Sequence, residues 1–152
     1  MDNINLVNND NSNTFHYDAF ISYRHLDPDS FAAERLHKKL ESFRLPSYVL
    51  KKHPELPKKI NRVFRDEEEL PLSSNLADPI TQALINCDNL IVICTPKLKE
   101  SKWCLQEIET FIKYHGRKHL FTALVEGEPD ESFPDILIGL SRQTKSLSKL
   151  II

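Results

Sequence analysis

Trp103 and Glu107 are the residues of this chain best placed for chemistry. They stand four positions apart, a spacing that puts both side chains on one face of a helix. The apolar run Leu90–Cys94 precedes them and is typical of a buried parallel strand. A strand, a short loop and a helix that carries a carboxylate form a common ligand site in open α/β sheets. The segment alone favours a structural tryptophan beside a solvated glutamate, so a site at this position needs support from the rest of the chain.

The composition restricts the class of protein. The chain has 152 residues, of which 40% are hydrophobic and 28% charged, as expected for one globular domain. A formal net charge of −2 gives no electrostatic case for a nucleic-acid partner. No apolar run approaches the length of about 20 residues that spans a bilayer, so no membrane partner is predicted. The three cysteines, Cys87, Cys94 and Cys104, lack paired spacing, which favours buried thiols in a reducing, cytoplasmic compartment.

The scarcity of glycine excludes two nucleotide cradles. Only Gly116, Gly127 and Gly139 occur, so neither a dinucleotide-binding glycine loop nor a P-loop can form. His115 and His119 lie on either side of Gly116 without a matching carboxylate or cysteine, and no metal site is predicted. Residues 1–14 are polar, lack a signal-peptide pattern and are expected to be a disordered tail.

Strands and helices are predicted to alternate along the chain. The expected strands are residues 17–23, 60–64, Leu90–Cys94 and 120–125. The first expected helix starts at Asp27-Pro28, and the second starts near Asn75 or Asp78. The third helix carries Trp103 and should end near His115, because Gly116 follows. This order predicts a flavodoxin-like, doubly wound parallel sheet of strand order 2-1-3-4-5 with helices on both faces.

Three regions are harder to assign. The first helix should present Ala32, Leu36, Leu40 and Phe43 to the core and end before Pro46. Residues 45–59, rich in proline and lysine, are interpreted as a surface loop, with a basic contact surface as the alternative. Residues 133–137 suggest a packed turn or short helix, and residues 147–152 a fifth strand or a last helix.

The predicted topology brings three segments together. In strand order 2-1-3-4-5 the switch point lies between strands one and three, where ligands bind at the carboxyl ends. Residues 23–25, 65–75 and 95–107 meet there, so Glu107 is expected to face a cleft beside Arg24. Thr95 and Pro96 follow the third strand, where a phosphorylatable receiver domain needs an aspartate, so that class is disfavoured.

The chain resembles the Toll/interleukin-1 receptor (TIR) domain family. The resemblance rests on residues 17–23, which read Tyr-Asp-Ala-Phe-Ile-Ser-Tyr, then on Arg65-Asp66 leading to Pro71, then on Trp103 with Glu107. These blocks occur in the family's order and cover about residues 15–137, so residues 15–152 are expected to form a TIR domain. The usual Pro-Gly of the second block is Pro71-Leu72 here. The family's last strand and helix are not legible before Ile152, so the chain could be cut from a longer parent protein.

The resemblance implies one of two functions. In the NAD-cleaving group, bacterial members included, the enzyme needs no cofactor and splits NAD+ into nicotinamide and ADP-ribose or a cyclic isomer. Such proteins often serve anti-phage defence and are activated by self-association through TIR–TIR contacts. The alternative is a non-enzymatic TIR–TIR interaction module. By resemblance Glu107 is the catalytic residue, and the substrate-binding residues are Tyr23, Arg24, Arg65, Asp66 and Trp103. A packing role for Trp103 stays open.

Overall fold

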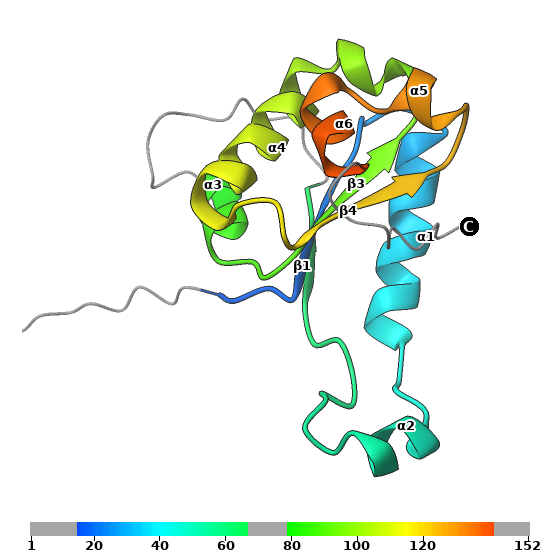
Figure 1. The fold of residues 1–152 in the computed structure, drawn as a ribbon, viewed down its shortest axis with the longest axis vertical. Coiled ribbons are helices and arrows are strands. Elements are labelled where there is room, and N and C mark those ends of the chain that lie inside the picture. Colours follow the sequence, from blue (N-terminus) through cyan, green and yellow to red (C-terminus); the bar gives the residue numbers. More distant parts are fainter. Residues whose placement is uncertain (1–14, 67–78, 142–152) are drawn as a thin grey trace, which may run out of the picture.

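A parallel β-sheet forms the centre of the molecule. The computed structural model describes residues 15–66 and 79–141. Its strands are β1 (Ala19–Ser22), β2 (Val63–Arg65), β3 (Leu90–Cys94) and β4 (Leu120–Leu124), hydrogen-bonded in the order β2-β1-β3-β4 (Figure 1). All pairings are parallel, which confirms the predicted doubly wound α/β sheet. The expected tail at residues 1–14 and the expected element at residues 147–152 lie outside the described residues.

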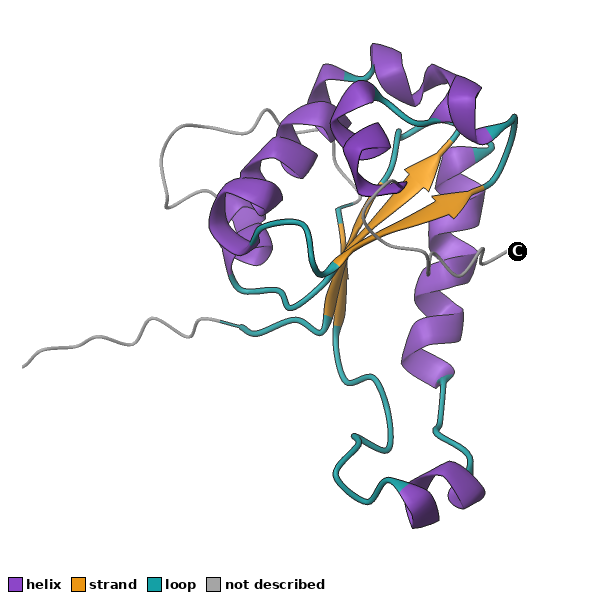
Figure 2. Cartoon of the chain, in the orientation of Figure 1, coloured by secondary structure: helices purple, strands orange, loops and turns teal. Residues whose placement is uncertain are grey.

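Helices cover both faces of this sheet. Helix α1 (Asp29–Ser42) lies on one face, and α3 (Pro79–Ile85), α4 (Lys102–His115) and α6 (Asp135–Ser141) lie on the other (Figure 2). The shorter elements are α2 (Ser47–Lys52), the 3₁₀ helix η1 (Pro96–Glu100) and α5 (Pro129–Ser132). Of residues 133–137, for which a packed turn or short helix was predicted, residues 133–134 connect α5 to α6 and residues 135–137 begin α6. Within the described ranges, every helix is too short or too polar to reach across a lipid bilayer.

Alternation along β1 decides which side chains meet which helix. Ala19 and Ile21 pack with α1, in a core that includes Leu36, whereas Phe20 faces α4 and packs in the core of Ile108. Successive strand residues point to opposite faces. Ser22, at the carboxyl end of β1, therefore shares the α4 face with Phe20.

Helix α1 starts later than the sequence suggested. It begins at Asp29, and the Asp27 side chain makes no capping hydrogen bond among the described residues. The helix ends at Ser42, before Pro46 as predicted. Ala32 and Leu36 are buried, but Phe43 is 47% exposed. The prediction for Phe43 was wrong because its backbone is already extended, which takes the side chain off the apolar stripe of the helix.

Residues 44–59 form a projecting segment, here termed the basic arm. An antiparallel bridge between Arg44 and Lys59 closes its base. The sequence predicted a loop, but the arm contains α2, none of whose residues is buried. Figure 1 shows the arm extending away from the sheet.

The first two strands are shorter than predicted. Tyr17 forms only an isolated bridge with Cys87. The Asp18 carboxylate accepts the backbone N–H groups of Asn61, at 2.5 Å, and Arg62, at 3.4 Å. This side-chain contact competes with ladder pairing, and β2 begins only at Val63.

Candidate functional site

Helix α4 carries Glu107 into the interior at the carboxyl end of β1. The helix starts after Ser101, whose Oγ accepts the Cys104 N–H at 3.3 Å, and ends at Gly116, whose φ is 74°. Both ends match the sequence prediction. Glu107 is 1% exposed, and the Ser22 hydroxyl donates a hydrogen bond to its Oε2 at 2.5 Å. Two elements far apart in sequence thus fix one carboxyl group.

The surroundings of Glu107 favour its protonated form. Burial raises the pKa of this carboxyl group to about 8, because removing it from water penalises the charged state. The hydrogen bond from Ser22 lowers the pKa, the nearby charge of Asp66 raises it, and the indole N–H of Trp103 lowers it. A group of this pKa can gain or lose a proton near neutral pH, as acid–base chemistry requires.

Trp103 lies one helical turn before Glu107. Its ring is partly buried against the core cluster on the α4 face. The indole N–H is near enough to lower the pKa of Glu107, yet Nε1 makes no hydrogen bond of ordinary geometry to any described residue. Buried indole N–H groups usually have a partner. Trp103 therefore both packs the helix and offers a donor beside the carboxyl group.

Tyr23, Arg65 and Asp66 form a second group, on the side of β1 and β2. The Tyr23 hydroxyl donates to the backbone carbonyl of Asp66, and its ring stacks on His25 at a centroid distance of 4.7 Å. Arg65 Nε donates to His37 Nδ1 at 3.4 Å. Asp66 lies near enough to Glu107 for its charge to raise the pKa of that carboxyl group, and Arg65 is directed toward α1. Residues 67–75, the rest of the predicted loop, lie outside the described residues.

Arg24 forms an ion pair with the buried carboxylate of Asp29. Its Nε and Nη2 donate to Asp29 Oδ2 and Oδ1, at 3.0 and 2.9 Å, and Asp29 is fully buried. The Thr95 hydroxyl donates to the same carboxylate, at 3.1 Å to Oδ2. Arg24 and Thr95 also line a hollow of about 420 Å³ at the carboxyl edge of the sheet, together with residues 26–28, 96–97 and Glu126.

Glu107 and Arg24 do not share that hollow. The residues that line it do not include Glu107, whose carboxyl group lies on the α4 face beside Ser22. The expectation that Glu107 faces a cleft beside Arg24 stays a prediction, because residues 67–75, which were expected to border that cleft, lie outside the described residues. The charges of both Glu107 and Asp29 contribute to the raised pKa of the Cys104 thiol.

The cysteines are buried thiols, as predicted. Cys87, Cys94 and Cys104 are free and buried, and burial raises the pKa of each to about 12. A thiol of this pKa is not a nucleophile at neutral pH.

Sequence interpretation missed Ser22, Asp29 and Thr95 as parts of the site. A signal existed for Ser22, because it is a polar residue on the same strand face as Phe20. Asp29 gave none, because Asp27-Pro28 fits a helix start by itself.

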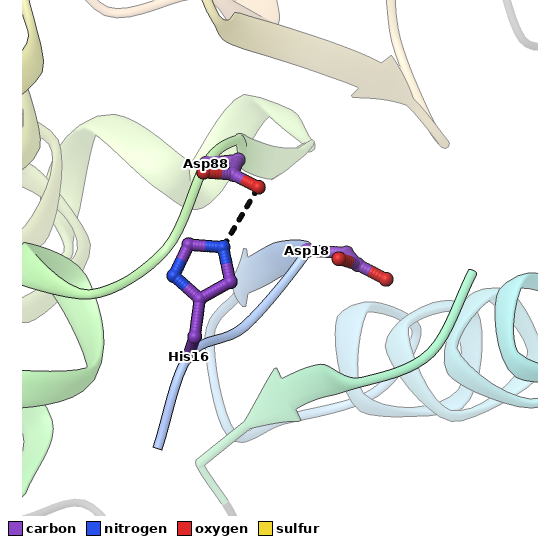
Figure 3. Close-up of side chains that lie close together, drawn as sticks. All are labelled: His16, Asp18 and Asp88. Atoms are coloured by element: carbon purple, nitrogen blue, oxygen red, sulfur yellow. Dashed lines mark hydrogen bonds and ion pairs between the residues drawn. The ribbon is translucent and has the colours of Figure 1, made fainter. Parts of the chain in front are cut away.

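His16, Asp18 and Asp88 gather at the opposite edge of the sheet, where β1 begins (Figure 3). His16 Nε2 contacts Asp88 Oδ2 at 2.9 Å. Both of these side chains are more than half exposed, and Asp18 is occupied by the backbone of Asn61 and Arg62. This group therefore has an evident structural role and lies apart from Glu107.

The fold and site together define a doubly wound α/β protein with two buried carboxyl groups, Asp29 and Glu107, at the carboxyl edge of its sheet. The chain belongs to the TIR domain family, whose model matches residues 19–149. It is 30% identical over 112 residues to a protein named NAD(+) hydrolase ApTIR from Actinoplanes sp.. That match covers 74% of this chain but only 14% of the relative.

The similar solved structures include the TIR domains of the activated Roq1 resistosome, which recognises the pathogen effector XopQ, with 20% identity and a TM-score of 0.45. The similarity covers 72% of this chain and 57% of that chain.

Proposed function

We propose that this TIR domain cleaves the nicotinamide–ribose bond of NAD+, with Glu107 as the catalytic residue. The observation that carries the proposal is the buried carboxyl group of Glu107, which accepts a hydrogen bond from Ser22 and has its pKa raised to about 8 by burial. The 30% identity to a protein named as an NAD(+) hydrolase supports the same reaction.

The chemistry needs only one carboxylate. Departure of nicotinamide builds positive charge on the ribose, as in glycoside cleavage. A carboxylate that contacts the ribose is attracted more strongly as this charge grows, so it lowers the barrier selectively. Nicotinamide leaves as a neutral molecule from a cationic nitrogen, so neither a general acid nor a cofactor is required. In this proposal Arg24 binds the pyrophosphate, and the other contacts come from Tyr23, Arg65, Asp66 and Trp103.

The described conformation is then a resting state. Glu107 is 1% exposed and, with a pKa of about 8, largely protonated at neutral pH. Catalysis requires that the carboxyl group lose its proton and reach the substrate. We propose that self-association through TIR–TIR contacts promotes this step, in a cytoplasmic bacterial protein of anti-phage defence. The product is ADP-ribose or its cyclic isomer.

Incubation with NAD+, followed by chromatography with mass detection, tests the proposal. Wild type should release nicotinamide together with one of the two ADP-ribose products. Glu107→Gln keeps the size of the side chain and should lower release at least about 100-fold, in the range typical for loss of a catalytic group. Glu109→Gln is the matched control, since Glu109 is exposed on the same helix. Equal turnover by wild type and Glu107→Gln would show that Glu107 is not the catalytic residue.

A non-enzymatic TIR–TIR interaction module is the second candidate, and the burial of Glu107 favours it. A sealed carboxyl group bonded to Ser22 can simply join α4 to β1. Under this alternative Glu107→Gln leaves partner binding intact and no variant releases nicotinamide. Charge reversals in the basic arm should then abolish partner binding.

A further inference from the structure

We propose that Asp29 is a positioning residue that holds Arg24 toward the hollow at the carboxyl edge of the sheet, where Arg24 receives the anionic part of the substrate. This inference rests on the proposed function for the identity of the substrate, NAD+. It assigns a role to a buried carboxylate that the reaction itself does not use.

The contacts form a clamp of three elements. Asp29, in the first turn of α1, is fully buried and holds both Nε and Nη2 of Arg24. Thr95, which follows β3, donates to the same carboxylate. A two-point contact fixes the plane of a guanidinium group as well as its position. The clamp therefore determines where the remaining Arg24 donors point.

The geometry leaves part of Arg24 for a ligand. The Arg24 side chain is 13% exposed and lines the hollow of about 420 Å³. Its Nη1 makes no hydrogen bond to any residue within 15–66 or 79–141. The hollow is also lined by Lys97 and by the carboxylates of Asp27 and Glu126, so the charges of its lining balance. The case for a phosphate-bearing ligand therefore rests on the planar donors of Arg24, which match phosphate oxygens.

Burial of Asp29 is otherwise unfavourable. A carboxylate loses hydration in the interior, and pairing compensates only when the geometry is good. A helix start does not need this arrangement, because a capping side chain can stay in water. The fully buried carboxylate of Asp29 is explained if it is needed to direct the partly exposed guanidinium group of Arg24 toward a ligand.

The main test separates positioning from stability. Asp29→Asn keeps the shape but removes the charge and one acceptor for Arg24. We expect KM for NAD+ to rise about tenfold or more, with kcat within about threefold, because a poorly directed Arg24 weakens binding. If Asp29→Asn only destabilised the fold, it would lower the fraction of active protein and hence the apparent kcat, and it would leave KM unchanged.

Variants at Thr95 keep the inference testable if Asp29→Asn does not fold. Thr95→Val removes only the hydroxyl and should raise KM a few-fold, whereas Thr95→Ser retains the donor and should restore the wild-type KM. The double variant Arg24→Gln/Asp29→Asn should match Arg24→Gln alone, because both changes remove one interaction. If the rises in KM caused by Arg24→Gln and Asp29→Asn add up in the double variant, the proposal is contradicted.

Binding of ADP-ribose, measured by calorimetry, distinguishes failure of this inference from failure of the proposed function. We expect Asp29→Asn to weaken ADP-ribose binding about tenfold. If wild type releases no nicotinamide but binding depends on Asp29, the proposed activity fails and the positioning role stands. If ADP-ribose binding is absent, or equal in wild type and Asp29→Asn, the positioning role is overturned.

Discussion

The carboxyl group of Glu107 links the pH dependence of stability to that of function. Its pKa of about 8 exceeds the ordinary value of 4.5, so the folded state binds a proton that the unfolded chain has lost between these pH values. Folding is therefore weakened as pH rises through this window, and the penalty is complete above a pH of about 8.

This linkage predicts that Glu107→Gln removes a pH-dependent loss of stability. The wild-type free energy of unfolding should fall, relative to the variant, by about 1.4 kcal/mol per pH unit between about pH 5 and 7.5. Urea titrations of both proteins at several pH values measure the difference. Glu109→Gln should follow wild type. Parallel stability curves for wild type and Glu107→Gln would show that the carboxyl group titrates normally.

Ser22 should tune the same carboxyl group. Its hydrogen bond lowers the pKa of Glu107, so Ser22→Ala should raise that pKa above 8, by about one unit if the bond contributes about 1.4 kcal/mol. Carbon-13 NMR of the Glu107 carboxyl group follows the titration. Ser132→Ala is a matched control, because Ser132 is buried and donates to the Glu126 carbonyl. An unchanged Glu107 titration in Ser22→Ala would contradict the assigned contact.

The sequence predicted the candidate carboxyl group but not its surroundings. The helical spacing of Trp103 and Glu107, placed after a buried strand, was enough to single out Glu107. Burial of that carboxyl group depends on how closely α4 packs on β1, which no local pattern specifies. The clamp of Arg24, Asp29 and Thr95 joins residues up to 71 positions apart, and only the folded sheet brings them together.

At the scale of elements, α4 is the most important single segment. It packs against β1, β3 and α3 and holds Glu107. Its start is defined by Ser101, and its end by Gly116, whose positive φ is readily adopted only by glycine.

Loss of the Ser101 cap should destabilise the domain moderately. Ser101→Ala removes the acceptor of the Cys104 N–H and should lower the free energy of unfolding by about 1 kcal/mol. Thermal or urea unfolding measures this effect. Ser42→Ala, at the exposed end of α1, should change stability by less than about 0.5 kcal/mol. Equal effects of the two substitutions would show that Ser101 does not act as a cap.

Elements with a strong periodic pattern were predicted best. The α4 boundaries and the β3 run matched because apolar spacing and Gly116 mark them directly. Helix α2 was missed because it is six residues long and buries no side chain, so it lacks an apolar stripe. Phe43 leaves the apolar stripe because the backbone becomes extended directly after Ser42. The residue types alone do not specify this change of backbone conformation.

At the scale of the whole molecule, the basic arm is the feature least explained by the fold. Its residues include Arg44, Lys51, Lys52, Lys58 and Lys59 against Glu55, although the chain has a formal net charge of −2. Tyr48 is 68% exposed within it. An exposed aromatic among basic side chains suits contact with a partner better than it suits the fold.

Charge reversal in the arm should affect assembly but not folding. Lys51→Glu/Lys52→Glu changes exposed residues only, so the melting temperature should stay within about 2 °C of wild type. If the arm takes part in TIR–TIR contacts, sedimentation velocity should show weaker self-association. Lys113→Glu/Lys118→Glu makes the same charge change elsewhere on the surface and is the control. Equal association of all three proteins would exclude the arm from the contact.

The pH dependence of nicotinamide release by wild type and Glu107→Gln tests the central claim most directly. With NAD+ far below KM, release by wild type should rise with pH and reach half its maximum near pH 8, because kcat/KM reports the pKa of Glu107 in the free protein. Release by Glu107→Gln should stay at least about 100-fold lower at every pH. A wild-type rate that is flat from pH 6 to about 9, or a Glu107→Gln rate equal to it, would contradict the account.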